Sequence, residues 1–162
     1  MTVRPAERSD VPRILDLWEA LMANGQQRDD RWVPSEGARH VMEDWGPDLW
    51  LPKEPFPHAW VAEADRPEGA RVVAWLDGHP SFSSPVLAGP RMATIGNLWV
   101  EPAWRRRGFG RALVEAFVDA ATRGGCHAIE VGTLTHDARA VGFWHAMGFG
   151  DWRVTLRRDA AD

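Results

Sequence analysis

The sequence predicts an α/β fold, built on a mixed and mostly antiparallel sheet with helices on both faces. Two observations lead to this prediction. Strand-like segments at 58–64 and 70–78 flank the turn "DRPEG", which predicts an antiparallel hairpin. Further along, strand, helix and strand follow one another between about residues 91 and 132. That order implies a right-handed crossover and a local parallel pair.

The first half of the chain begins with a short extended segment, "TVRPA", followed by two helices. Apolar spacing predicts a helix from Ser9 or Asp10 to Asn24, where the next residue is glycine. A shorter helix is expected over 35–45, stopped by Gly46 and Pro47, with a proline-rich loop after it. The hairpin follows, and then a second loop over 79–90.

The second half carries the clearest helix, over 107–125, with a polar face and one apolar stripe that includes Leu113 and Phe117. The remaining expected elements are strands at 91–100, 126–134 and 151–159 and a helix at 136–148. We expect one domain over 1–162, with an acceptor-side half (about 1–90) and a cofactor-binding half (about 91–150).

Composition excludes several classes of protein. The net charge of −4, from 23 acidic and 19 basic side chains, provides no global field for nucleic acid. The single cysteine, Cys126, excludes an internal disulfide framework and is compatible with the cytoplasm. No signal peptide is visible and no apolar run approaches the roughly 20 residues that span a bilayer, so we expect no membrane association.

The stretch "EPAWRRRGFGRALVEAF" gathers four arginines around Gly108 and Gly110, directly before the clearest helix. Helix N-termini favour anions because their N–H groups and dipole point outwards, and glycine lets the backbone approach a phosphate closely. Guanidinium groups add charge and planar donors. The pattern predicts a site for a diphosphate with a further phosphate nearby.

The sequence of this turn has three other interpretations. A Rossmann site needs G-x-G-x-x-G early in a repeated βαβ array, but Leu113 replaces the third glycine and only 52 residues follow Gly110. Glu130 does stand at the offset of a ribose-binding acid. The P-loop pattern G-x-x-x-x-G-K-[ST] is absent. The third alternative, a solvated arginine run before an ordinary helix, stays open.

Two motifs resemble the GCN5-related N-acetyltransferase (GNAT) superfamily. "LWVEPAWRRRGFGRAL" is similar to its acyl-CoA-binding motif, Arg/Gln-x-x-Gly-x-Gly/Ala, and "DARAVGFWHAMGF" to its second signature, Asn-x-x-Ala-x-x-x-Tyr-x-x-x-Gly-Phe. The matching positions are Arg105, Gly108, Gly110, Ala140, Gly148 and Phe149. Asp137 and Trp144 stand where Asn and Tyr are usual. The two motifs place the resemblance within residues 91–150. Before residue 91 it rests only on the order of the helices and strands.

The resemblance implies acetyl-CoA as the cosubstrate and a central parallel pair of strands that splay apart. Pantetheine would lie in the opening, and the thioester carbonyl would meet main-chain groups near Leu98 and Val100. The pyrophosphate would sit on the turn. The cofactor-binding residues implied are Leu98, Trp99, Val100, Arg105, Arg106, Arg107, Gly108, Phe109, Gly110, Arg111, Asp137, Ala140 and Trp144.

The implied reaction is direct attack by an amine on the thioester. A primary amine has a pKa near 10.4, so a base or a desolvating pocket must free its lone pair. Asn97 can position a water but cannot take a proton, and Glu101 is the nearest carboxylate in sequence. Trp144 replaces the family's acidic tyrosine; its indole only donates a hydrogen bond. We expect slow turnover, or water as the acid.

The acceptor amine is expected to meet the first half of the chain, as is usual in the family. The segment "MEDWGPDLWLP" offers Asp44, Trp45, Asp48 and Trp50, and carboxylates beside an indole face favour a cation. A small-molecule amine or a peptide N-terminus fits, whereas no metal site is expected. A homodimer through the C-terminal strand is compatible with the family. Two alternatives stay open: a CoA-binding module with little catalysis, and a transferase for another acyl group.

Overall fold

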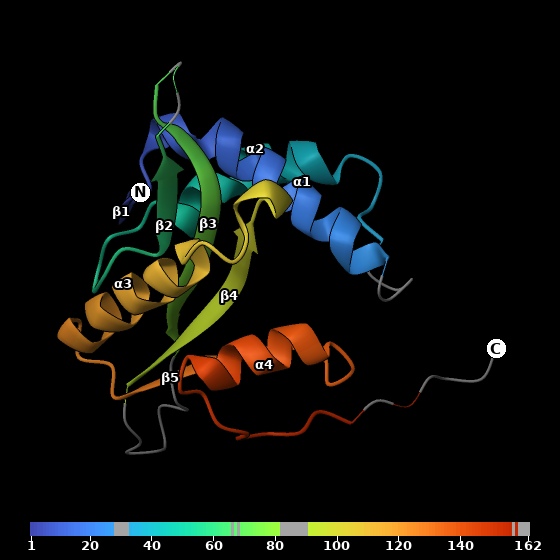
Figure 1. Cartoon of the computed structure of the whole chain (residues 1–162), viewed down its shortest axis with the longest axis vertical. Coiled ribbons are helices and arrows are strands. Elements are labelled where there is room, and N and C mark those ends of the chain that lie inside the picture. The colour runs from blue at the N-terminus through green and yellow to red at the C-terminus, as the bar shows by residue number, and fades with distance from the viewer. Residues whose placement is uncertain (28–32, 66, 68, 82–90, 157, 159–162) are drawn as a thin grey trace. The chain divides into compact units, whose positions relative to one another are not determined.

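The computed structural model describes residues 1–27, 33–65, 67, 69–81, 91–156 and 158. They form two compact units, Met1–Gly132 and Thr133–Asp162. The second unit holds α4 (Ala138–Ala146). The first unit holds the sheet and the other helices (Figure 1). Its elements are β1 (Thr2–Pro5), α1 (Val11–Gln26), α2 (Ala38–Trp50), β2 (Ala59–Ala64), β3 (Arg71–Ser81), β4 (Met92–Val100), α3 (Phe109–Arg123) and β5 (Ala128–Val131), with short 3-10 turns at Arg8–Asp10 and Pro102–Trp104.

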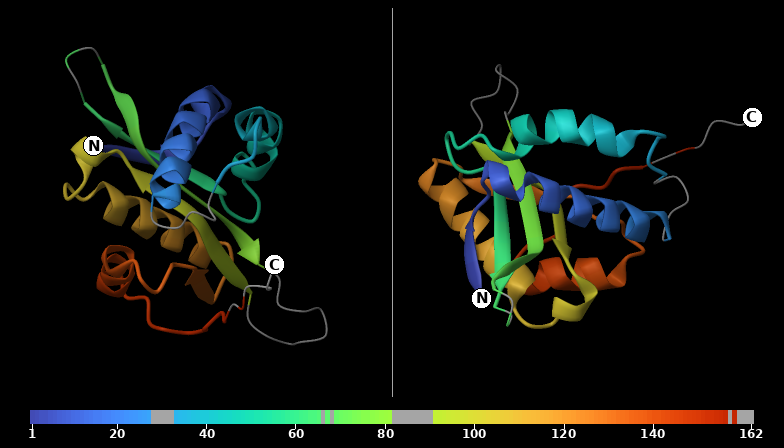
Figure 2. Two further views of the ribbon diagram at one scale, coloured as in Figure 1. Left: turned by 90° about the vertical axis from the view of Figure 1, so that its right-hand side faces the viewer. Right: turned by 90° about the horizontal axis from the view of Figure 1, so that it is seen from above.

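The sheet has the order β1-β2-β3-β4-β5. The first four strands pair antiparallel, and β4 and β5 pair parallel. Within this unit α1 and α2 cover one face of the sheet and α3 covers the other (Figure 2). The predicted fold class is therefore confirmed, because both the hairpin and the parallel crossover occur where the sequence predicts them.

The core of the first unit is aromatic on both sides of the sheet. Trp75 of β3 is fully buried on the α1–α2 face, beside residues of α1 such as Ile14 and Leu17. Phe117 of α3 is fully buried on the other face. A Cβ on Gly78 would lie 2.5 Å from the Phe117 ring, so only glycine lets α3 approach β3 this closely. This packing fixes the strands around which the site is built.

Two helix ends differ from the prediction. Neither Gly25 nor Gly46 ends its helix, and α2 continues through Pro47 to Trp50. Proline removes one N–H from the helical ladder, but Leu51 N still donates to Pro47 O, at 3.0 Å. The last turn of α2 persists because the Trp50 side chain is buried, with only 3% of its surface exposed. Tertiary packing overrides the local stop signal.

The prediction of a last strand at 151–159 is wrong for its described residues. Residues 151–156 have no regular structure, and the side chains of Trp152, Val154 and Leu156 are exposed. Their apolar alternation is typical of a strand, but a strand also needs a partner for its N–H and C=O groups. Three of the predicted connections lie partly outside the described residues, at 28–32, at 66 and 68, and at 82–90. Residues 79–81 were expected in a loop, but they extend β3.

Candidate functional site

The parallel pair at the centre of the sheet separates after four residue pairs. β5 pairs with β4 only from Met92 to Ile95. Glu101 N donates to Val73 O of β3 at 3.0 Å, so the main chain of Trp99 also faces β3. Because neighbouring residues of a strand face opposite edges, the main-chain groups of Leu98 and Val100 face the edge that β5 has left. Within the described part of the first unit, the strand expected to meet pantetheine therefore has an open edge beyond Ile95.

The glycine turn after β4 has the conformation of an anion site. Arg106 (φ 62°) and Gly108 (φ 88°) are both left-handed, a geometry that turns successive N–H groups inwards. The helix α3 then starts at Phe109 without a side-chain cap, and its first main-chain bond runs from Ala112 N to Gly108 O. The N–H groups of its first turn are therefore left for a ligand.

The arginines of this turn divide into anchors and exposed cations. Arg105 lies 4.6 Å above the Trp99 ring and its Nε donates to Val100 O at 2.9 Å, which ties the turn to the end of β4. Arg107 stacks 5.0 Å above Trp104, and its side chain is exposed. Arg106 is exposed, and Arg111 pairs with Glu115 at 3.5 Å. The phosphate-binding charge would come mainly from the exposed members.

Asn97 is held by a buried carboxylate that the sequence analysis missed. Asp77 of β3 accepts from Asn97 N at 3.0 Å and from Asn97 Nδ2 at 3.1 and 3.2 Å. Trp50 Nε1 donates to the same carboxylate at 3.0 Å. Burial raises the pKa of Asp77 to about 6, although these hydrogen bonds oppose the rise by stabilising the ionised form. An acid inside the apolar run "VVAWLDG" was the available signal.

Glu101, the other carboxylate near the end of β4, is the centre of an ion-pair cluster. Arg13 of α1 and Arg71 of β3 both bind its carboxylate, Arg71 at 3.1 Å. Arg13 also donates to Val72 O at 3.0 Å. Two guanidinium groups from different elements thus share one carboxylate. The cluster connects α1 and β3 to the residue that follows β4.

Replacement of Glu101 by glutamine tests whether this side chain does more than connect these elements. We expect Glu101→Gln to lower the free energy of unfolding by about 1 kcal/mol, because a partly exposed ion pair contributes no more than that. Urea denaturation measures this loss. If Glu101 were also the general base, kcat would fall by about 100-fold or more while acetyl-CoA still bound; a purely structural role leaves kcat nearly unchanged.

The expected acceptor residues lie on α2 but do not share one environment. Asp44, Trp45 and Asp48 are exposed, with 65% of the Trp45 surface accessible. Asp44 and Asp48 are four residues apart and so lie on one side of the helix. Trp50, expected beside them in a loop, is instead the buried last residue of α2 and binds Asp77. The structure brings the three exposed residues together and places Trp50 in the core.

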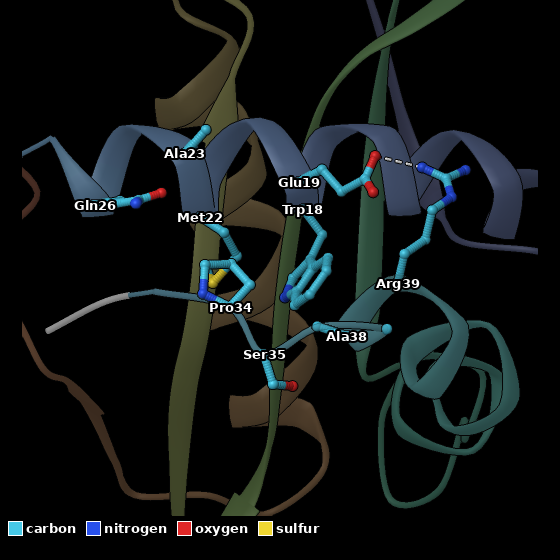
Figure 3. Close-up of a pocket in the computed structure, with 10 residues that line it drawn as sticks. Trp18, Glu19, Met22, Ala23, Gln26, Pro34, Ser35, Ala38 and Arg39 are labelled. Carbon is cyan, nitrogen blue, oxygen red and sulfur yellow. Dashed lines mark hydrogen bonds and ion pairs between the residues drawn. The ribbon is translucent and has the colours of Figure 1, made fainter. Parts of the chain in front are cut away.

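A hollow of about 340 Å³ lies between α1 and the start of α2 (Figure 3). Trp18 and Met22 of α1 face Pro34 across it. Glu19 is bound to Arg39 at one side, so its charge is already paired. The hollow is a candidate surface for the apolar part of an acceptor, and the sequence analysis did not single it out. Its lining residues are Trp18, Glu19, Met22, Ala23, Gln26, Pro34, Ser35, Gly37, Ala38 and Arg39.

The second unit contains the remaining predicted site residues. Asp137 caps α4, since its Oδ1 accepts from Ala140 N at 3.1 Å. Aspartate thus fills the structural role that asparagine fills at an N-cap. Trp144 is 8% exposed and its ring packs against Phe143 and Phe149, at centroid distances of 5.0 and 5.3 Å.

Two further observations concern the described part of the chain. No group of three or more His, Cys, Asp or Glu residues within it is arranged to hold a metal ion. None of the helices within it has the length and apolar character required to cross a bilayer.

An open strand edge that leads into an arginine-rich turn at an uncapped helix start defines an acyl-CoA-binding transferase fold. The family model described as "Acetyltransferase (GNAT) family" matches residues 16–149, and the chain belongs to this family. The resemblance on which the sequence analysis relied is therefore confirmed. The protein is an acyl-CoA-dependent N-acetyltransferase.

Named relatives match over nearly the whole chain. The thialysine N-ε-acetyltransferase of Bos taurus is 26% identical over 153 residues, 92% of this chain and 84% of the relative. The N-α-acetyltransferase RimI of Mycobacterium tuberculosis is 30% identical over 158 residues, 98% of this chain and 82% of the relative. Both relatives are N-acetyltransferases, one named for a side-chain amine and one for an α-amine.

Solved structures share the fold. A tetramutant of the BH1408 protein from Bacillus halodurans superposes with a TM-score of 0.77 at 20% identity, over 99% of this chain and 100% of that chain. AAC(6′)-Iy in complex with the bisubstrate analogue CoA-S-monomethyl-acetylneamine superposes with a TM-score of 0.72 at 17% identity, over 99% and 98%. These likenesses extend the agreement in fold beyond the two motifs.

Proposed function

We propose that the protein transfers the acetyl group of acetyl-CoA to an amine by direct attack on the thioester. The observation that carries this proposal is the continuity of the open edge of β4 with the uncapped N-terminus of α3. A CoA pyrophosphate on the turn would let the pantetheine arm run along Leu98 and Val100. The implied roles of Asp137, Ala140 and Trp144 in holding the cofactor belong to the same proposal.

The chemistry follows from this placement. The amine nitrogen bonds to the thioester carbon, negative charge develops on the carbonyl oxygen, and the C–S bond then breaks. Main-chain N–H groups at the open edge of β4, those of Leu98 and Val100, stabilise that developing charge. The thiolate is a fair leaving group, since a thiol has a pKa near 8.5. Trp144 offers it at most a hydrogen bond, so water supplies the proton.

The acceptor in this proposal is a cationic amine, recognised on the side of α1 and α2. The exposed carboxylates of Asp44 and Asp48 would attract it, and the exposed Trp45 ring would stack on it. Relatives named for a lysine analogue and for an α-amine favour this class. Asn97 would position the water that takes the amine's proton. Location in the cytoplasm and pairing into a homodimer remain expectations of the sequence.

The first test is calorimetric titration of acetyl-CoA, CoA and NAD into the protein. We expect micromolar binding of acetyl-CoA and CoA and none of NAD, because the turn holds a pyrophosphate while the strand edge selects pantetheine. Thiol release is then measured with thialysine, a polyamine and a peptide with an N-terminal alanine. Binding without thiol release from any of them would favour the alternative of a CoA-binding module. Absence of binding would refute the proposed function.

A further inference from the structure

Asp77 is a buried carboxylate that joins the two sides of the site. It lies in the middle of β3, only 9% of its surface is exposed, and no ion pair to it occurs among the described residues. Its four hydrogen-bond contacts come from three donors on two different elements, Trp50 on α2 and the main and side chains of Asn97 on β4. All four contacts come from protein donors, so the carboxylate holds parts of the protein in place.

The contacts with Asn97 coincide with a bulge in β4. Asp77 pairs with Asn97, but Gly78 pairs with Ile95, so Gly96 is the extra residue. A Cβ on Gly96 would lie 2.5 Å from Asp77 Oδ1, and the carboxylate therefore fills the space that a side chain would need. Asn97 N donates to this carboxylate, the side chain of the β3 residue with which Asn97 pairs. The side chain of Asp77 thus binds the main chain of β4 directly beside the bulge.

The bulge decides how the next residue of β4 is directed. With Asn97 N turned to Asp77, the main chain of Leu98 faces the open edge that β5 has left. A rotation of the peptide between Asn97 and Leu98 would move the Leu98 N–H out of line with that edge. Misalignment of a donor by about 1 Å is enough to cost 100-fold in rate.

The contact with Trp50 connects the same carboxylate to the acceptor side. Trp50 is the last residue of α2. Its ring packs edge-on against the ring of Trp75, with 5.8 Å between the two ring centroids. Its indole N–H reaches Asp77 Oδ2, while Asn97 N reaches Oδ1. One side chain therefore sets the position of the end of α2 relative to the bulge.

We infer that Asp77 is a positioning residue of the acetyl transfer: it holds the bulge at Gly96 and Asn97 so that the Leu98 N–H points at the thioester oxygen, and it fixes the end of α2 against that bulge. It touches no reacting atom. This inference rests on the proposed function, because it assumes that the thioester lies at the open edge of β4.

The test compares Asp77→Asn with Asp10→Asn, a matched change at another buried carboxylate of the same unit, which binds Arg4 and Glu7 N. We expect Asp77→Asn to lower kcat by about 10- to 100-fold while the Kd for acetyl-CoA changes less than about threefold. Asp10→Asn should lower the melting temperature and leave kcat of the folded enzyme unchanged. Equal kcat in Asp77→Asn and wild type would overturn the inference, as would parallel losses of kcat and affinity.

Trp50→Phe provides a second variant in case Asp77→Asn does not fold. It keeps the ring packing on Trp75 and removes one donor to the carboxylate. A loss of about threefold or more in kcat at unchanged acetyl-CoA affinity would support the positioning role, and an unchanged kcat would contradict it. Wild-type protein that neither binds acetyl-CoA nor releases thiol would instead refute the proposed function, which keeps the two failures distinct.

Discussion

Gly108→Val is expected to weaken acetyl-CoA binding by about 100-fold or more. Gly108 is the N-cap of α3 at φ 88°, a conformation that a β-branched residue adopts only with strain. Relaxation of that strain would turn the first N–H groups of α3 away from the pyrophosphate. A Cβ at this position has no neighbour within 4 Å, so the substitution creates no clash inside the protein. Calorimetric titration measures the loss.

The chain offers a matched control for this variant. Gly37 is the N-cap of α2, has φ 77°, and also has no neighbour within 4 Å of an added Cβ. Gly37→Val therefore imposes the same backbone strain on a helix start outside the proposed cofactor site. Both variants should lose about 1 to 3 kcal/mol of stability, and only Gly108→Val should lose cofactor affinity. Equal affinity for acetyl-CoA in the two variants would argue that the turn does not hold the pyrophosphate.

Asp77 is expected to make the protein less stable as pH rises from about 4 to about 6. Burial raises its pKa in the folded state from 3.8 to about 6. Between these values the folded state binds more protons than the unfolded state, so the free energy of unfolding decreases with increasing pH. Each pH unit across this window is worth about 1.4 kcal/mol, which gives a total near 3 kcal/mol.

Other groups also change protonation at acidic pH, and each changes the free energy of unfolding in its own way. The contribution of Asp77 is therefore measured as the difference in stability between wild type and Asp77→Asn. Burial lowers the pKa of His58, which adds stability as pH rises toward 6.5. Burial alone would raise the pKa of Asp10, but hydrogen bonds from Arg4 and Glu7 N outweigh it and lower that pKa, so its contribution is lost only at more acidic pH. Both groups are unchanged in Asp77→Asn and cancel in the comparison.

Urea denaturation of wild type and Asp77→Asn at several pH values between 4 and 7 measures this difference. The stability of wild type relative to the variant should decrease by about 3 kcal/mol across the window and level off above it. Parallel stability curves would show that Asp77 does not titrate in this range. Curves that diverge in the opposite direction would show that its pKa is lowered in the folded state.

The fold and the glycine turn could be predicted because their signals are local. The strand expected at 58–64 is found at Ala59–Ala64, and the helix expected at 107–125 is found at Phe109–Arg123. Apolar periodicity and glycine positions specify these elements within a few residues of chain. The same is true of the left-handed turn, which depends on Gly108 and its neighbours.

The features that the sequence did not predict depend on partners distant in the chain. α2 passes Pro47 because Trp50 is anchored on Asp77, 27 residues away. Asp77 itself resembles the polar end of a strand before a glycine, and only the register with β4 shows that it lies in the middle of β3. Glu101 is the nearest carboxylate in sequence after β4, which made it a candidate base. Its two guanidinium partners come from α1 and β3, and the order of the chain does not reveal that these elements meet there.

The left-handed backbone of Arg106 has a consequence for the kinetics of cofactor binding. A residue with a side chain adopts φ near 62° only where the surrounding structure imposes it. The turn is thus preorganised, and the entropy of ordering it is lost during folding and not on encounter with the ligand. Association should then be limited by diffusion and by electrostatic attraction to the exposed arginines, and its rate should decrease as salt screens them.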